Sequence, residues 1–124
     1  MKKIYQSIDG NIFENACECW NEDWREHFPN IRIYSDEGEL VSDVTNATFI
    51  TFSNAEERLF GVQIARELLP YTPEENLLCT FEPGVICISK ADGEAFINTE
   101  EEILSDMIYE EDQNSDLYRD LTNS

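Results

Sequence analysis

The residue types best suited to nucleophilic or metal chemistry in this chain are four cysteines and one histidine. They are Cys17, Cys19, Cys79, Cys87 and His27. A nucleophilic thiolate needs a base or a positive field beside it, and nearby carboxylates raise the pKa of a thiol instead. The residues around His27 are mostly acidic. We therefore expect His27 to be a surface or boundary residue, and we expect the chain not to be an enzyme.

A zinc site built from these cysteines is disfavoured by their spacing. Cys17 and Cys19 are two residues apart on an expected helix, so their side chains point about 200° apart. Cys79 and Cys87 would lie on opposite faces of a tight hairpin turning at Pro83-Gly84. We interpret all four as reduced cysteines that act as small buried hydrophobic side chains. No metal or cofactor site is predicted.

Charge is the strongest signal in the composition. The 124 residues include 27 Asp plus Glu and only 8 Lys plus Arg, for a net charge of -19. Hydrophobic residues make up 41% of the chain, so we expect one folded domain over residues 1–124 rather than a disordered acidic tail. Direct binding of nucleic acid is disfavoured because Lys and Arg are what hold phosphates. A basic protein partner, which handles nucleic acid, is the partner that this charge favours.

Some of the carboxylates recur at every fourth position within two expected helices. Like charges at that spacing destabilise a helix, so two such rows indicate a use beyond solubility. The predicted partner-binding residues are these two rows and the two acids that follow the second row: Glu18, Glu22, Glu26, Glu102, Asp106, Glu110, Glu111 and Asp112. The alternative is that both rows are merely solvated faces of the protein.

The elements that position these rows are expected to form an α+β fold, with about three helices packed on one face of antiparallel hairpins. Two hairpins should turn at Asp9-Gly10 and Asp92-Gly93, because this dipeptide suits a turn with positive φ. The helices should begin at Asn15, Ser53 and Thr99, each of which has Glu three residues later as in a capping box.

Further strands are expected at 31–34, 39–44, 48–52, 77–81 and 85–90. The second helix is predicted to have an apolar face formed by Ala55, Leu59, Val62 and Leu69 and widened by Phe60, Ile64 and Leu68. Tyr109, like the two tryptophans, is expected to lie mostly in the core. Residues 111–124 are expected to fray or to form one short turn.

The two ends of the chain share a plan of strand, Asp-Gly turn, short strand and helix, which raises the possibility of an internal ββα repeat. Aligning the two turns matches Asn15 with Asn98 and Asp23 with Asp106. The alternative is that any hairpin followed by a helix selects similar residues for local reasons. Gln6, Ser7 and Asp9 interrupt any apolar segment of a signal peptide, so we expect a cytoplasmic protein with no membrane contact.

In size, acidity and lack of catalytic motifs, the whole chain resembles the small phage and mobile-element inhibitors of host defence, the anti-CRISPR and antirestriction proteins. The resemblance is compositional and assigns no residue roles. It implies an inhibitor that imitates nucleic acid and occupies the basic nucleic-acid-binding surface of a host defence protein, in the host cytoplasm. Two other interpretations stay open: an immunity protein that neutralises a cationic nuclease toxin, and a small phage structural or regulatory protein.

Overall fold

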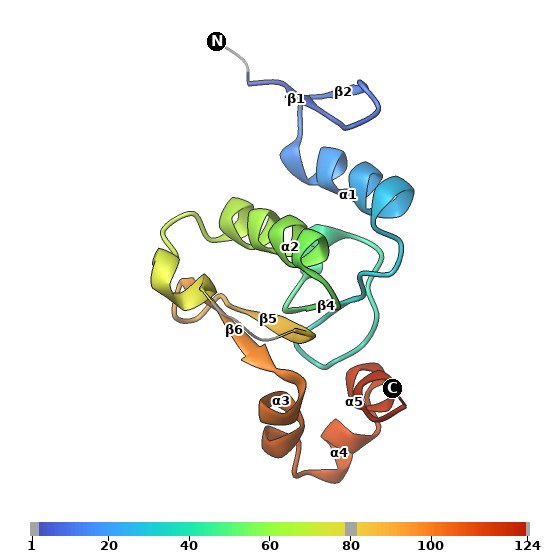
Figure 1. Ribbon diagram of the computed structural model, residues 1–124, viewed down its shortest axis with the longest axis vertical. Coiled ribbons are helices and arrows are strands. Elements are labelled where there is room, and N and C mark those ends of the chain that lie inside the picture. Colours follow the sequence, from blue (N-terminus) through green and yellow to red (C-terminus); the bar gives the residue numbers. More distant parts are fainter. Residues whose placement is uncertain (1–2, 79–81, 124) are drawn as a thin grey trace.

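The computed structural model describes residues 3–78 and 82–123, and these form an α+β fold (Figure 1). The strands are β1 (Tyr5–Gln6), β2 (Ile12–Phe13), β3 (Ile33–Tyr34), β4 (Phe49–Phe52), β5 (Gly84–Ser89) and β6 (Glu94–Thr99). The α-helices are α1 (Ala16–His27), α2 (Ala55–Leu68), α3 (Glu100–Asp106), α4 (Glu110–Gln113) and α5 (Asp116–Thr122). Two 3-10 helices, η1 (Val44–Asn46) and η2 (Glu74–Leu77), complete the described part. The expectation of about three helices was too low, since the described residues form five.

The strands form two antiparallel sheets. A four-stranded sheet has the order β3-β4-β5-β6, and β1 pairs only with β2 in a separate two-stranded sheet. In the larger sheet Ile86 of β5 lies opposite Ile50 of β4 on one side and Ile97 of β6 on the other. Successive side chains of a strand point to opposite faces, so this register sends Ile86 and Val85 into different cores.

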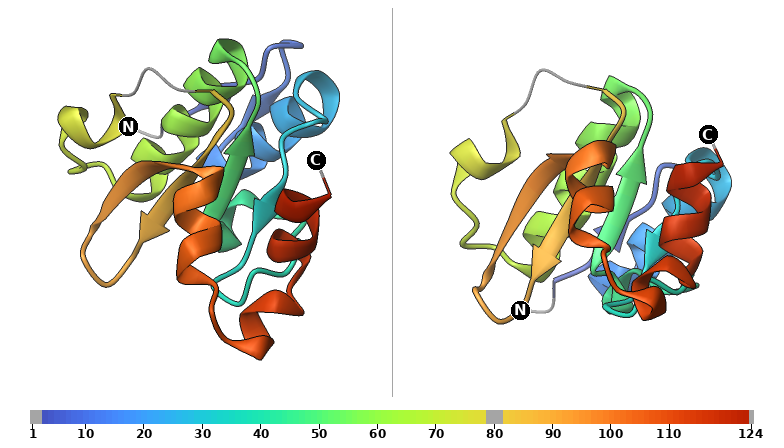
Figure 2. Two further views of the ribbon diagram at one scale, coloured as in Figure 1. Left: turned by 60° about the horizontal axis from the view of Figure 1, so that its bottom comes forward. Right: turned by 90° about the horizontal axis from the view of Figure 1, so that it is seen from below.

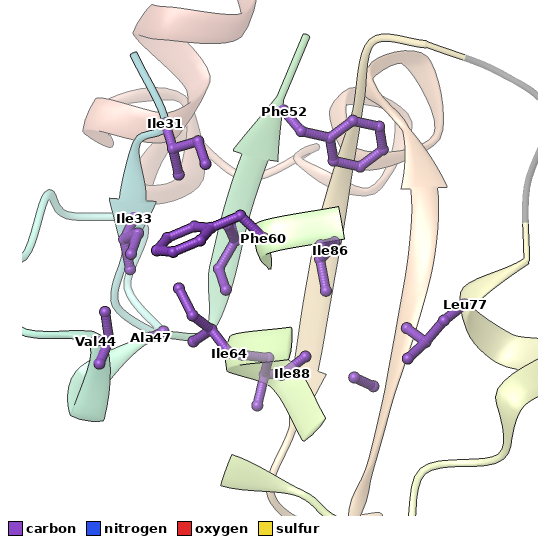
Figure 3. Packing of buried hydrophobic residues seen from close by; sticks show 13 residues of the cluster. Ile31, Ile33, Val44, Ala47, Phe52, Phe60, Ile64, Leu77, Ile86 and Ile88 are labelled. Carbon is purple, nitrogen blue, oxygen red and sulfur yellow. The ribbon is translucent and has the colours of Figure 1, made fainter. Parts of the chain in front are cut away.

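Both faces of the four-stranded sheet are covered, each by its own apolar cluster. Helix α2, flanked by α1, covers the face that carries Ile50, Ile86 and Ile88 (Figure 3). Helices α3 and α5 cover the face that carries Tyr34 and Val85 (Figure 2). The prediction that all helices lie on one face of the sheet was therefore wrong. The side chains of β5 are mostly apolar on both sides of the strand, so neither side could be left facing water.

Helix α2 approaches the sheet closely through Gly61. A Cβ atom at this position would lie 2.7 Å from Cδ1 of Ile86 and 3.2 Å from Cγ2 of Ile50, so only glycine fits without a shift. The buried face of α2 includes Phe60 and Ile64, whereas Leu59 is 61% exposed. The predicted apolar face was right for Phe60 and Ile64 and wrong for Leu59 and Ala55, which are both exposed.

The cap of α2 also differs from the prediction by one residue. The N-cap is Asn54, whose Oδ1 accepts a hydrogen bond from the backbone N of Glu57 at 2.9 Å. Ser53 instead donates through its backbone N and its hydroxyl to the Glu57 carboxylate, at 2.8 and 2.7 Å. The predicted caps Asn15 of α1 and Thr99 of α3 are confirmed, and Thr99 forms a full capping box with Glu102.

The C-terminal segment is folded rather than frayed. Helix α5 buries Leu117 and Leu121, which are 0% and 6% exposed, against Tyr34 and Ile103. The backbone N of Leu117 donates to the carbonyl of Gly38 at 2.9 Å. Residues 117–121 therefore complete the second core and cannot be removed without exposing it.

The hairpins predicted at the two Asp-Gly turns are confirmed, and so are strands at 31–34, 48–52 and 85–90. Gly10 and Gly93 both have positive φ, at 89° and 72°. The expected strand at 39–44 is reduced to a single bridge between Tyr34 and Leu40, followed by η1. In the expected strand at 77–81, Leu77 belongs to η2, and residues 79–81, with Cys79, lie outside the described residues.

The two ββα units have the predicted order, but their aligned residues do not play equivalent roles. Asn15 caps α1, whereas the cap of α3 is Thr99 rather than the matched Asn98. Asp23 is 4% exposed and its Oδ1 accepts from the backbone N of Ile8 at 2.8 Å. The matched Asp106 is an exposed residue at the end of α3.

Candidate functional site

The second predicted row of carboxylates is not a single helical row. Helix α3 ends at Asp106, and Glu110 begins a separate helix, α4. Glu102 is also partly committed, because its Oε1 accepts from the backbone N and the hydroxyl of Thr99, both at 3.1 Å. The break between α3 and α4, and not the spacing of four residues, therefore determines how these acids are arranged in space.

These acids nevertheless lie in a segment that is almost free of basic residues. We define the C-terminal acidic face as the exposed carboxylates of α3 and α4: Glu101, Glu102, Asp106, Glu110 and Glu111. Asp112 beside them is half-buried. Residues 100–124 contain nine acids and one base, Arg119. Its Nη2 donates to Oδ1 of Asp116 at 2.7 Å, and its Nε lies 3.9 Å from Oδ1 of Asp120. The only base in this segment is therefore already occupied by acids of α5.

Two large apolar side chains are exposed in the middle of the C-terminal acidic face. Ile108 is 69% exposed and Tyr109 is 66% exposed, and both lie in the connection between α3 and α4. The prediction that Tyr109 belongs mostly to the core was wrong, because the helix that would have turned it inward ends three residues earlier. Exposed aromatic side chains surrounded by charge are common anchors of protein interfaces.

The first predicted row, on α1, has a different environment. Glu18 and Glu26 are exposed, and they line a shallow groove of about 500 Å³ together with Glu22 and Arg25. Oε1 of Glu22 accepts from Nδ2 of Asn11 at 2.7 Å. Its Oε2 is buried and has no hydrogen-bond partner among the described residues. The positively charged Arg25 thus lines the same groove as the acids of α1 and makes the net charge of this groove less negative.

The two acidic groups do not meet. Trp20 and Trp24 of α1 pack on the core beneath α2, whereas Ile103 of α3 packs on the core of the opposite sheet face. Figure 1 shows α1 and α4 toward opposite ends of the longest axis, with the sheet between them. The eight predicted partner-binding residues therefore lie on two separate surfaces of the molecule rather than on one.

The cysteines and the histidine show no activated group in the described residues. Burial raises the pKa of Cys19, and Asp23 and Glu22 raise it further. Burial raises the pKa of Cys87 to about 11, although Nδ2 of Asn98 donates to its Sγ at 3.3 Å. Both thiols therefore stay protonated at neutral pH. Cys79 lies outside the described residues. His27 is exposed as predicted, and its Nε2 lies 2.9 Å from Oδ1 of Asp9.

A pocket of about 410 Å³ lies where α5 meets the sheet, and the sequence offered no signal for it. The Tyr34 hydroxyl donates to Oδ2 of Asp120 at 2.6 Å, and Nη1 of Arg32 donates to the same oxygen at 3.2 Å. Burial, and then the hydrogen bond to Asp120, raise the pKa of Tyr34 well above its ordinary value. A neutral phenol and a paired guanidinium hold α5 in place but offer no base or nucleophile.

No group of Cys, His, Asp and Glu side chains in residues 3–78 and 82–123 is placed to hold a metal ion. Within the same ranges no helix combines the length and apolarity needed to cross a membrane. Neither the models of known families, nor the curated proteins, nor the solved structures include a match to this chain.

Proposed function

We propose that this chain is an acidic protein-binding inhibitor that occupies the basic nucleic-acid-binding surface of a host defence protein through its C-terminal acidic face. The observation that carries the proposal is the charge of this face. Five exposed carboxylates lie on two short helices, and the one base of residues 100–124 is paired within α5. A surface of this kind offers carboxylates to Arg and Lys without competition from its own cations.

Helix α3, which carries three of the five carboxylates of the C-terminal acidic face, is held in place before any partner arrives. Helix α3 is fixed at its start by the capping box of Thr99 and Glu102 and is anchored by the buried side chain of Ile103. A rigid array of carboxylates suits the imitation of duplex nucleic acid, which presents one charge per roughly 1.7 Å of its axis. Preordered groups also lose little conformational entropy on binding.

The face on α1 is the weaker candidate for the same role. Arg25 lies among its acids, and Glu22 is engaged by Asn11. A basic partner would therefore meet a mixed surface there. We assign the contact to α3 and α4, and we keep the acids of α1 as the matched control.

The test compares two double variants that change the net charge equally. Asp106→Lys with Glu110→Lys alters the C-terminal acidic face, and Glu18→Lys with Glu26→Lys alters α1. Each Asp or Glu to Lys change adds two charges, so both variants go from -19 to -15. No hydrogen bond of the described residues uses these four carboxylates, in contrast to Glu102. Both variants should therefore fold.

Affinity capture from host lysate with the tagged wild-type chain comes first, at salt of about 100 mM and about 500 mM, because exposed charge pairs are screened at the higher salt. We expect a nucleic-acid-handling protein that is recovered only at low salt, and whose binding to DNA or RNA the chain inhibits. The variant of α3 and α4 should weaken this binding on the order of 100-fold, and the α1 variant by much less.

Three outcomes would contradict the proposal. Equal loss in both double variants would show that only total charge matters. A partner that keeps its nucleic-acid binding in the complex would exclude mimicry. Recovery of a cationic nuclease toxin would favour the immunity-protein interpretation instead.

A further inference from the structure

The β1–β2 hairpin exposes an apolar surface that the proposed function does not use. Ile4, Ile8 and Ile12 are 62%, 60% and 56% exposed. Ile12 lies opposite Gln6 in the register, and alternation along the strand places Ile4 on the same side as Gln6. On the other side of the hairpin Ser7 is 5% exposed, toward α1. The hairpin therefore has a covered face and an uncovered apolar face.

The apolar surface continues from the hairpin onto α2. Ile8 and Leu59, which is 61% exposed, line a groove of about 260 Å³ with Trp20 and Phe28. The same groove holds Glu56 and the buried Asp23, so its charge is acidic, whereas the hairpin itself carries no net charge. The centre of the uncovered surface is thus the hairpin, with Leu59 at its margin.

Charge identifies what this surface can accept. Residues 3–13 contain one base, Lys3, and one acid, Asp9, in a chain of net charge -19. Two hairpins that meet therefore bring no net charge of their own into the contact. The C-terminal acidic face, which we assign to the basic partner, lies at the opposite end of the molecule (Figure 1).

The two charges of the hairpin also suit a two-fold contact. Lys3 stands at the open end of the hairpin, and Asp9 stands in the turn, where its Oδ1 lies 2.9 Å from Nε2 of His27. If two hairpins pack face to face and antiparallel, Lys3 of each copy approaches Asp9 of the other. A two-fold axis repeats this favourable pairing, because both copies use the same patch.

We propose that a second copy of this chain covers the uncovered hairpin face, forming a two-fold dimer through Ile4, Ile8 and Ile12. The dimer holds the two C-terminal acidic faces at its far ends, so the proposed partner contact stays accessible. A standard interface engages about 20 to 30 residues on each side, far more than one hairpin supplies. The dimer is therefore weak and forms at high protein concentration.

Sedimentation equilibrium of the full-length chain tests the proposal. Protein concentrations span about 10 μM to 1 mM, which covers weak affinities. Each series is run at about 50 mM and about 500 mM salt. We expect the dimer fraction to rise with concentration and to rise again at high salt, because screening reduces the repulsion between copies and leaves the apolar contact intact. Capture of a basic partner should respond to salt in the opposite direction, so failure of either proposal is recognised separately.

Paired variants locate the contact. Ile4→Ser with Ile12→Ser should weaken dimerisation at least about tenfold while circular dichroism and thermal unfolding stay close to wild type, since both side chains are exposed. Ile108→Ser and Tyr71→Ser remove exposed apolar side chains at other sites and should leave the dimer unchanged. A wild-type chain that stays monomeric at every concentration and salt overturns the proposal. So does a dimer that survives the hairpin variant or is lost in a control.

Discussion

The N-terminal unit β1–β2–α1 and the later unit β5–β6–α3 follow the same order and leave opposite kinds of surface uncovered. Each hairpin turns at an Asp-Gly pair, and each helix begins at a capped residue. The strands of the first hairpin have two residues each, and those of the second have six. Strand β5 has β4 on its other side, whereas β1 and β2 pair only with each other among the described strands.

This difference shows that local sequence determines the order of strands and helix in each unit. Membership of the four-stranded sheet determines which surface of the unit stays exposed. The second hairpin belongs to the four-stranded sheet, and apolar clusters cover both faces of that sheet. The residues that α3 leaves exposed are mostly charged. The first hairpin packs on α1 outside the four-stranded sheet and leaves its isoleucines uncovered. An isolated two-stranded hairpin is at best marginally stable in water, so this one depends on α1 beneath it.

The largest contrast between the two regions should appear in stability. Leu117→Ala removes a fully buried side chain from the second core and should lower the free energy of unfolding by about 2 to 5 kcal/mol. Ile12→Ala on the exposed face of the hairpin should change it by less than about 0.5 kcal/mol in the monomer. Urea unfolding at low protein concentration measures both. An equal, small effect of both substitutions would show that α5 is not part of the cooperative core.

Tyr34→Phe should sharpen the comparison through pH. The substitution removes the hydrogen bond from the Tyr34 hydroxyl to Asp120. A hydrogen bond to a charged acceptor contributes about 1.5 to 3 kcal/mol to the free energy of unfolding. The pKa of Tyr34 is raised in the folded chain, so its contribution is present below the unfolded value of about 10 and is lost as pH rises through the folded pKa. The stability difference between wild type and variant should therefore be constant from about pH 6 to about pH 9 and shrink above about pH 10. A difference that grows with alkaline pH would contradict this assignment.

The smallest expected effects concern the helix caps of the two units. Thr99→Ala removes a hydroxyl that accepts from the backbone N of Glu102 at 3.0 Å, and should cost about 1 kcal/mol. Asn15→Ala removes a side chain that accepts from the backbone N of Cys17 at 2.8 Å, with a similar cost. Only the Thr99 variant should also weaken partner binding, because α3 carries the C-terminal acidic face. Thermal unfolding and the capture assay together separate the two effects.

Sequence reasoning located elements well where a local signal determined them. Asn15 and Thr99 were predicted as caps because each satisfies backbone N–H groups within its own first turn. The cap of α2 was misplaced because Ser53 and Asn54 are adjacent and both can cap. The end of α3 was missed because Met107 and Ile108 continue the apolar spacing past the residue where the helix stops.

The sequence predicted which residues of the candidate site are acidic but not which of them share a surface, because that depends on contacts between residues far apart in the chain. The acidic residue types and their density are visible in the sequence, and the exposure of Asp106 and Glu110 agrees with them. Which acids share a surface depends on the order of strands in the sheet, and no spacing reports that order. The bond between Tyr34 and Asp120 joins residues 86 positions apart, so it too was invisible.

The position of α5 in the second core also has a consequence for synthesis of the chain. The face of the sheet that carries Val85 is not covered until Leu117 and Leu121 have been added. Ribosomes add about 5 to 20 residues per second, so the 36 positions from Val85 to Leu121 take roughly 2 to 7 s. During that interval the nascent chain presents an apolar strand surface that a chaperone could hold. Expression should therefore suffer more from a stall in this late stretch than from one in the segment that encodes the first hairpin.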